Sequence, residues 1–359
     1  MRTAALATLC HTNVISWPYL WTDFNQGDFM KRRILAATIA TFFAVNTPVV
    51  AFAAEQIGGN DAFSFIAMGD MPYKLPDDNA KVDRLIGAIN AMKPSFTLHV
   101  GDIKSGSSPC TDENFKKAFD QLQTIEPPLM YTIGDNEWTD CHREKAGKFD
   151  PRERLAKIRE MFFANPEQTL GKNPMAVESQ SKAMPKFAKF VENRRFTKNG
   201  IMIVSIHVVG SNNGFEAQDP AAAVEFFERN AANIVWLDDS FAKAKEAGAK
   251  GVVVFFQADP FDLKQIEEGM PRASGMVDTV KAFERASKSF GKPILAIHGD
   301  NHTLELKAFP DTKGKPIPNV MKLQLFGEKL NHAVRVIVDP SSPAVFGYMP
   351  LIVPENGNF

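Results

Sequence analysis

The chain has 359 residues, of which 44% are hydrophobic and 23% are charged. This composition is typical of a globular protein with its own core, and it excludes a low-complexity or disordered chain. The 41 basic and 42 acidic residues leave a net charge of −1. So small a charge gives no electrostatic reason to expect nucleic acid or an anionic membrane surface as a partner.

Residues 30–53 have the pattern of a secretory signal peptide. Met30-Lys31-Arg32-Arg33 is a basic start, Ile34–Val45 is an apolar run too short to span a bilayer, and Ala51-Phe52-Ala53 is a cleavage pattern. We predict that translation begins at Met30, that residues 1–29 are a mis-called upstream leader, and that the mature protein is periplasmic or secreted without a stable membrane anchor. The alternative is that the apolar run remains as an anchor.

Strands and helices are expected to alternate from residue 61 onwards, which predicts an α/β fold. Buried strands are predicted from apolar runs, and helices from apolar residues at helical spacing. After residue 298 three short apolar segments follow one another without helices, and we expect them to be antiparallel. The predicted strands are 63–68, 96–100, 129–133, 201–209, 252–256, 294–298, 320–326, 333–339 and 345–348, and the predicted helices are 77–92, 114–124, 152–163, 220–245 and 275–289.

Residues 165–199 interrupt this alternation. The segment is polar, rich in lysine and broken by Pro166, Pro174 and Pro185. We interpret it as a surface insertion with some helix, in which the basic residues form a solvated face rather than a phosphate clamp. No domain boundary is evident elsewhere, so we expect a single domain over 61–350.

Cys110 and Cys141 are an even pair in a chain that we expect to be exported, and Cys10 lies in the leader. Such a pair predicts a disulfide bond. Each cysteine follows a predicted strand end by a few residues, so the two loops are expected to begin side by side. The alternative is two free thiols, which thiol titration in denaturant would count.

Four predicted strands end in a Gly-Asp pair. Ligands of open α/β sheets bind beyond the carboxyl ends of the strands. Several carboxylates gathered there would repel one another unless a cation lay among them. We therefore predict a metal site centred on Asp102, the alternative being aspartates that each cap their own turn. The four pairs are Gly69-Asp70, Gly101-Asp102, Gly134-Asp135 and Gly299-Asp300.

The order of these pairs resembles the calcineurin-like metallophosphoesterase family over nearly the whole mature chain. Gly101-Asp102 through Gly106 is close to the family block Gly-Asp-x-x-x-x-Gly, one spacer short. Gly134-Asp135-Asn136-Glu137 corresponds to Gly-Asn-His-Asp/Glu, and Gly299-Asp300-Asn301-His302 to Gly-His-x-His. Asp70-Met71-Pro72 and Gln257 lack the histidines of the remaining blocks. The chain thus resembles a divergent member in which several metal-ligand histidines are replaced.

The resemblance implies a four-layer αββα sandwich of two mixed β-sheets and a site for one or two divalent metal ions. Asp102 would bridge, Asp70 and His302 would bind one ion, and Asp135, Gln257 and Asp300 would bind the other. Tyr73 is a further candidate ligand, because the related purple acid phosphatases use a tyrosine. The oxygen-rich ligand set favours Mn²⁺ or Mg²⁺ over Zn²⁺.

The function implied by the resemblance is hydrolysis of a small phosphomonoester or phosphodiester by metal-bound hydroxide. Asn136 stands where the family has its catalytic histidine, and an amide is unable to act as a general acid. His142, in the same loop, is a candidate substitute acid, and its alternative is a surface histidine. For the whole protein, the alternatives are a catalytically inactive binding protein on the same scaffold and a purely structural one-metal site.

Overall fold

The computed structural model describes residues 59–261 and 274–357. The predicted leader and signal peptide lie outside the described residues. Within the described ranges, no helix has both the length and the apolar character needed to cross a membrane.

The strands form two mixed sheets. The first sheet has five strands, of which three neighbours at one side are parallel, and the two last strands of the chain are added at the other side, each antiparallel to its neighbour. Its order is β12 (Phe346–Leu351), β11 (Ala333–Val338), β1 (Phe63–Met68), β2 (Thr97–His99) and β3 (Leu129–Tyr131).

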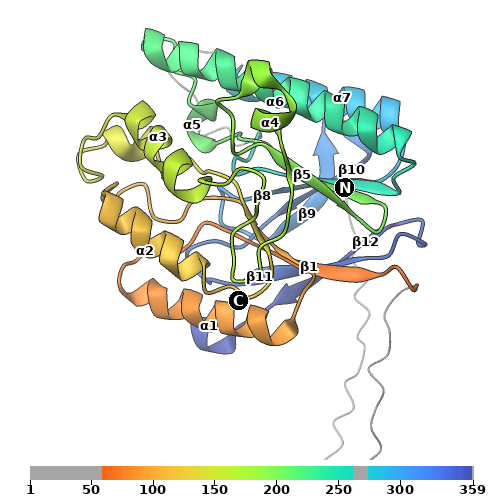
Figure 1. The fold of residues 1–359 in the computed structure, drawn as a ribbon, viewed down its shortest axis with the longest axis horizontal. Helices are drawn as coiled ribbons and strands as arrows, with labels where there is room; N and C mark the ends of the chain where they lie inside the picture. The colour runs from red at the N-terminus through yellow and green to blue at the C-terminus, as the bar shows by residue number, and fades with distance from the viewer. Residues whose placement is uncertain (1–58, 262–273, 358–359) are drawn as a thin grey trace, which may run out of the picture. The chain divides into compact units, whose positions relative to one another are not determined.

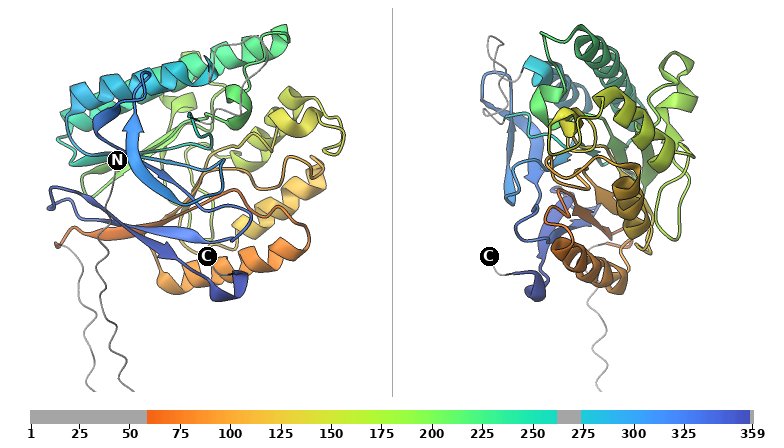
Figure 2. Two further views of the ribbon diagram at one scale, coloured as in Figure 1. Left: turned by 180° about the vertical axis from the view of Figure 1, so that it is seen from behind. Right: turned by 90° about the vertical axis from the view of Figure 1, so that its left-hand side faces the viewer.

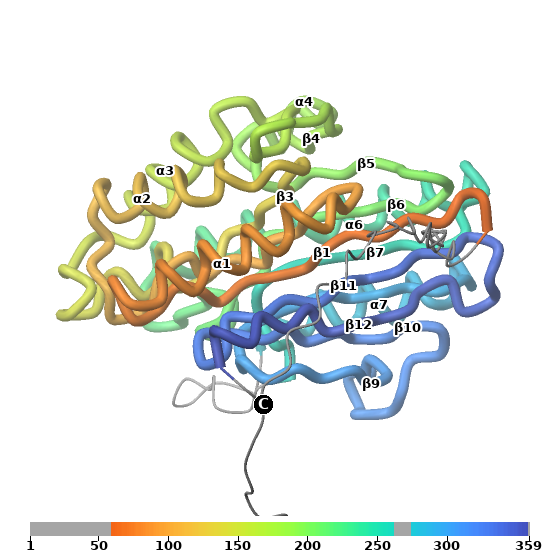
Figure 3. Tube along the Cα trace, turned by 90° about the horizontal axis from the view of Figure 1, so that it is seen from below, coloured from red at the N-terminus to blue at the C-terminus, as the bar shows by residue number. Residues whose placement is uncertain are grey.

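The second sheet has seven strands and a parallel centre flanked by antiparallel edges. Figure 3 shows β4 and β5 at one end of this sheet and β9 at the other. The order is β4 (Glu178–Ser179), β5 (Arg194–Lys198), β6 (Ile201–Ser205), β7 (Gly251–Phe255), β8 (Ile294–His298), β10 (Pro316–Gln324) and β9 (Glu305–Pro310).

Helices cover the outer faces of both sheets. In Figure 1 the long helices α6 (Pro220–Glu246) and α7 (Val277–Phe290) run along the top and α1 (Asp77–Met92) along the bottom, with the strands between them. The view from behind in Figure 2 has the same order of layers. The other helical segments are α2 (Asp112–Leu122), η1 (Thr139–His142), α3 (Pro151–Phe162), α4 (Gln180–Ala183), η2 (Pro185–Phe187), α5 (Gly210–Asn213), η3 (Ser274–Met276) and η4 (Pro354–Asn356).

Successive side chains of a strand point to opposite faces of its sheet. Each strand can therefore contribute to two apolar layers, one beneath the helices and one between the sheets. In β1, Ile66 packs in the apolar cluster that contains residues of α1, α2 and α3, whereas Phe65 packs between the two sheets. In β7, Val253 also packs between the sheets, whereas Val252 joins the cluster under α6 and α7. These three apolar layers separate four layers of backbone, and the expected αββα sandwich is confirmed.

Two expectations about individual elements need correction, and one strand was not expected. The strand predicted at 201–209 ends at Ser205. The segment predicted at 320–326 belongs to β10, which is antiparallel to β9, as expected, but parallel to its other neighbour β8. The sequence did not indicate β9. The first four positions of this edge strand are exposed or half-exposed, so no apolar pattern is required there.

The end of the segment 165–199 is part of the sheet rather than a surface insertion, because β5 pairs with β6. Its two arginines are buried instead of solvated. Arg194 donates to the carbonyl oxygen of Tyr131 at 3.0 Å, and Arg195 donates to the carboxylate of Glu178 at 2.8 Å. A buried guanidinium needs such partners, since an unpaired charge in the core is costly. These side chains tie the edge of the second sheet to the rest of the fold.

The predicted disulfide is confirmed. Cys110 and Cys141 are bonded, with their Cα atoms 5.8 Å apart, and both residues are buried. Each Sγ lies 3.8 Å from the carbonyl oxygen of Asn136. The bond therefore packs directly against the loop that follows β3.

The double variant C110A/C141A is expected to lower the free energy of unfolding by about 3–4 kcal/mol, because the bond closes a loop of 31 residues in the unfolded chain. Urea denaturation followed by circular dichroism measures the change. Reduced wild-type protein, which keeps both sulfur atoms, is the control that separates loss of the bond from loss of side-chain volume. An unchanged midpoint in both samples would contradict the prediction.

Candidate metal centre

The predicted site residues other than His142 meet where the parallel strands of both sheets end. Asp70 follows β1, Asp102 follows β2 and Asp135 follows β3. Gln257 and Asp300 follow β7 and β8 of the other sheet. Because the carboxyl ends of parallel strands lie at one edge, residues up to 230 positions apart are brought together there.

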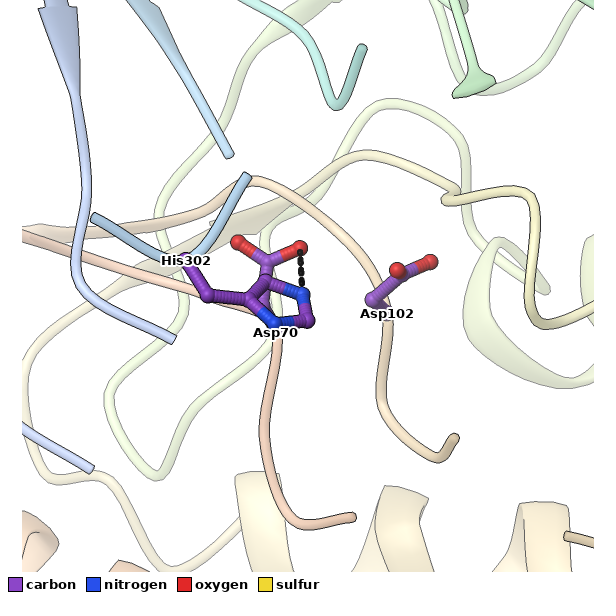
Figure 4. A group of neighbouring side chains, drawn as sticks. All are labelled: Asp70, Asp102 and His302. Carbon is purple, nitrogen blue, oxygen red and sulfur yellow. Dashed lines mark ion pairs between the residues drawn. The ribbon is translucent and has the colours of Figure 1, made fainter. Parts of the chain in front are cut away.

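Asp70, Asp102 and His302 form the tightest group. One potential ligand atom from each lies within 4.8 Å of the other two. Both aspartates are buried, and the side chain of His302 is 21% exposed, with its Nε2 3.8 Å from Asp70 Oδ1. In Figure 4 Asp70 and His302 face each other and Asp102 lies beside them on a separate strand end.

Two of the four Gly-Asp glycines make this approach possible. A Cβ atom added to Gly134 would lie 2.0 Å from Asp102 Oδ1, and one added to Gly299 would lie 2.0 Å from Asp70 Oδ2. A Cβ atom on Gly134 would also lie 2.5 Å from the Asp102 backbone nitrogen, so only glycine fits there, whereas a Cβ atom on Gly299 would displace the Asp70 carboxylate. Each of these glycines therefore makes room for the carboxylate of a different strand end.

The backbone is left-handed at four of the predicted ligands. Asp70, Asp102, Asp300 and His302 have φ values of 55°, 60°, 79° and 58°. For a residue with a side chain this conformation costs on the order of 1–3 kcal/mol, and it persists only where the surroundings impose it. Such residues cluster at binding and catalytic sites.

Asp102 is the centre of a hydrogen-bond network. Its Oδ2 accepts from Tyr73 Oη at 2.6 Å, from Asn136 Nδ2 at 2.7 Å and from Gln257 Nε2 at 3.3 Å. Its Oδ1 accepts from the Asn136 backbone N–H at 3.2 Å. Asn136 Nδ2 also donates to Tyr73 Oη at 2.6 Å. The structure thus gathers three further predicted residues around this one carboxylate.

Asp135 and Asp300 face each other across the start of α5. A Cβ atom on Gly210 would meet Asp135 Oδ2 at 2.5 Å and Asp300 Oδ1 at 3.0 Å. Ser211 Oγ donates to Asp135 Oδ2 at 3.0 Å, and the backbone N–H of Asp259 donates to Asp300 Oδ2 at 2.9 Å. Sequence reasoning missed Gly210, Ser211 and Asp259 as site residues. The only signal was their place directly after two predicted strands.

His142 lies apart from this network. Its side chain is exposed, and its Nδ1 lies 2.6 Å from the carbonyl oxygen of Thr139. Among the described residues, no hydrogen bond or ion pair joins it to a predicted metal ligand. Its assignment as the general acid stays a prediction.

The electrostatics of the group suit a divalent cation. Burial raises the pKa of Asp70 and that of Asp102 well above the usual value, and neighbouring carboxylates raise both further. Asp70 Oδ2 is buried and has no hydrogen-bond partner in the described part of the chain. Burial lowers the pKa of His302, which favours the neutral imidazole that ligates metals. Oxygen donors with one imidazole therefore fit a bound dication.

His99 contacts the backbone next to Asp102. It is buried in β2, and its Nδ1 accepts from the backbone N–H of Gly101 at 3.1 Å, next to Asp102. Burial lowers the pKa of His99 to about 3. His207 and His298 are also buried, and burial lowers the pKa of each to about 4.

The free energy of unfolding of the variant His99→Asn is expected to decrease less between pH 7 and pH 5 than that of the wild type. A histidine that is neutral in the native state and protonates in the unfolded chain costs stability as the pH falls below about 6.5. For His99 this amounts to about 2 kcal/mol between pH 7 and pH 5. Asparagine keeps the acceptor for Gly101 and does not titrate. Urea denaturation at the two pH values, with the wild type as control, measures the difference, and parallel curves would contradict it.

The fold and the site together define an αββα sandwich with an acidic cluster, capable of holding a cation, at the carboxyl ends of its parallel strands. No protein-family model matches the sequence, and no curated protein matches it. A comparison with solved structures returns several matches.

Among them is a dimetal phosphatase from Danio rerio, with a TM-score of 0.47 and 11% identity over 81% of this chain and 98% of that one. GAP50, the anchor in the inner membrane complex of Plasmodium, has a TM-score of 0.44 and 10% identity over 81% and 89%. Purple acid phosphatase PPD1 from yellow lupin (Lupinus luteus) has a TM-score of 0.46 and 11% identity over 83% and 55%. At such identities the site must be judged on this chain's own residues.

Proposed function

We propose that this protein is an exported, metal-dependent phosphoesterase that hydrolyses a small phosphomonoester or phosphodiester. The observation that carries the proposal is the convergence of Asp70, Asp102 and His302 within 4.8 Å at the carboxyl ends of the strands. Two buried acids beside a neutral imidazole form a site whose charge a divalent cation would balance. The buried disulfide and the signal pattern at 30–53 support export.

In this proposal the chain's own residues hold and orient the reacting groups. A bound divalent cation supplies positive charge that activates water and stabilises the charge developing on phosphoryl oxygens. Asp70, Asp102 and His302 would hold the cation. Asn136 and Tyr73 fix the orientation of Asp102, since their hydrogen bonds to its Oδ2 are short, at 2.7 and 2.6 Å. The oxygen-rich surroundings favour Mn²⁺ or Mg²⁺ over Zn²⁺.

The leaving group decides which substrates should be tried first. Both amide hydrogens of Asn136 are donated within the site, to Tyr73 and Asp102, and an amide has no proton to give a leaving oxygen. The proposed general acid is His142, which lies outside the hydrogen-bond network of Asp102. Nitrophenyl esters, whose leaving group departs without protonation, are therefore the appropriate first substrates.

The test is hydrolysis of p-nitrophenyl phosphate and bis(p-nitrophenyl) phosphate by the mature chain with Mn²⁺, Mg²⁺, Ca²⁺ or Zn²⁺. We expect turnover with Mn²⁺ or Mg²⁺ that chelation by EDTA abolishes. A natively folded protein without activity in any metal would overturn the proposal. Binding of a phosphate ester without turnover would then favour the catalytically inactive binding protein.

A further inference from the structure

The orientation of the Gln257 side chain is fixed by one hydrogen bond. Its Oε1 accepts from the backbone N–H of Gly210 at 2.6 Å, and a backbone N–H is always the donor. The Nε2 group must therefore point the other way, towards Asp102 Oδ2 at 3.3 Å and Asp300 Oδ1 at 3.4 Å. Gln257 is fully buried, so these interactions are shielded from water. It presents hydrogens, not lone pairs, to the two carboxylates.

The two halves of the acidic cluster differ in how their oxygens are satisfied. On the Asp300 side, protein donors already reach the carboxylates: Asp300 accepts from the Asp259 N–H and from Gln257, and Asp135 accepts from Ser211. On the Asp70 side, Asp70 Oδ1 accepts from the Asp300 backbone N–H at 3.1 Å, whereas Asp70 Oδ2 is buried and lacks a hydrogen-bond partner among the described residues. His302 offers an imidazole nitrogen there, 3.8 Å from Asp70 Oδ1. Asp102, which lies between the two sides, accepts hydrogen bonds at both of its oxygens.

A hydrogen-bond donor and a cation compete for the same carboxylate lone pairs. Where N–H and O–H groups already point at the oxygens, a second dication would have to displace them and would meet the Gln257 amide hydrogens at close range. Where an oxygen is buried without a partner, a cation removes an existing penalty. The Gln257 amide hydrogens therefore oppose an ion between Asp102 and Asp300, whereas the unpartnered Asp70 oxygen favours an ion on the other side of Asp102.

We infer that the site binds one divalent cation, held by Asp70, Asp102 and His302, and that Gln257 is a positioning residue that takes the place of a second ion by donating to Asp102 and Asp300. The inference rests on the metal site of the proposed function and narrows it. It also assigns different roles to Asp70 and Asp300, two aspartates that follow the same Gly-Asp pattern. Substitution of each to asparagine should therefore have unequal effects.

The experiment loads the mature chain with Mn²⁺, removes free ion by desalting, and measures bound Mn²⁺ by native mass spectrometry and electron paramagnetic resonance. We expect one ion per chain and the spectrum of an isolated Mn²⁺. The variant Gln257→His removes the amide donor and adds a ligating nitrogen, and it is expected to bind two ions with a spin-coupled spectrum. Neither readout depends on turnover.

The matched pair Asp70→Asn and Asp300→Asn tests the same inference while Gln257 stays unchanged. Asp70→Asn is expected to weaken Mn²⁺ binding by about 100-fold or more, since even the loss of a group that only supports a ligand costs about 10–100-fold. Asp300→Asn is expected to keep one ion. Two coupled ions in the wild type, or equal losses in the pair, would overturn the inference and leave the proposed function standing. No bound Mn²⁺ in the wild type would overturn both.

Discussion

Asp102→Asn is expected to lower kcat/KM for phosphate-ester hydrolysis by about 10³-fold or more, which corresponds to about 4 kcal/mol of transition-state stabilisation. The change removes the charge of the central carboxylate. It also places an NH₂ group where the protein already presents donors. Oδ2 accepts from Tyr73 and Asn136, and Oδ1 accepts from a backbone N–H, so either orientation of the new amide sets a donor against a donor.

The same variant is expected to stay folded. In the absence of metal, burial raises the pKa of Asp102, so the charged form is costly in the native state and its removal offsets part of the cost, about 1–3 kcal/mol, of the opposed donors. Thermal unfolding in EDTA measures this, and calorimetric titration with Mn²⁺ measures the loss of binding. Asp238→Asn on α6 is the control, because it makes the same chemical change at a residue whose ion pair with Arg285 is about half exposed on both sides. Wild-type turnover in Asp102→Asn would contradict the central role of this residue.

Gly134→Ala is expected to reduce both Mn²⁺ affinity and kcat/KM by about 100-fold or more, although it adds one methyl group and changes no charge. That methyl carbon would lie 2.0 Å from Asp102 Oδ1 and 2.5 Å from the Asp102 backbone nitrogen. The second contact is to backbone, so a side-chain rotation alone does not relieve it. Displacement of a catalytic group by about 1 Å is enough for a loss of this size.

Gly87→Ala is the matched control for this substitution. Gly87 lies within α1, and an added Cβ atom would meet nothing within 4 Å. Alanine is the better helix former by about 1 kcal/mol, so Gly87→Ala is expected to raise the unfolding midpoint slightly and leave metal binding unchanged. Equal activity in the two variants would show that close approach at Gly134 is not required.

Much of the fold can be predicted from the sequence, because strand and helix periods are local. The strands at 63–68 and 294–298 have the predicted bounds, and the long helix that begins at Pro220 ends within one residue of its predicted end. The Gly-Asp pairs and the disulfide were predicted from residue type and order. The repeated Gly-Asp pairs indicated a common site, and an even pair of cysteines in a chain expected to be exported indicated a bond.

Side-chain partners were decided by the tertiary structure alone. The sequence indicates a glutamine after β7, but not that a backbone N–H 47 positions away would turn its amide hydrogens towards two aspartates. Nor does it indicate that Gly134 packs against Asp102, or that the arginines of β5 are buried. The physical reason is that periodicity is read along one segment, whereas hydrogen bonds and close contacts depend on how two sheets are placed against each other. The sequence by itself therefore determined most of the central strands and helices and where acids gather, and only the packing of the sheets decided the edge strands and which oxygen atoms remain available to a cation.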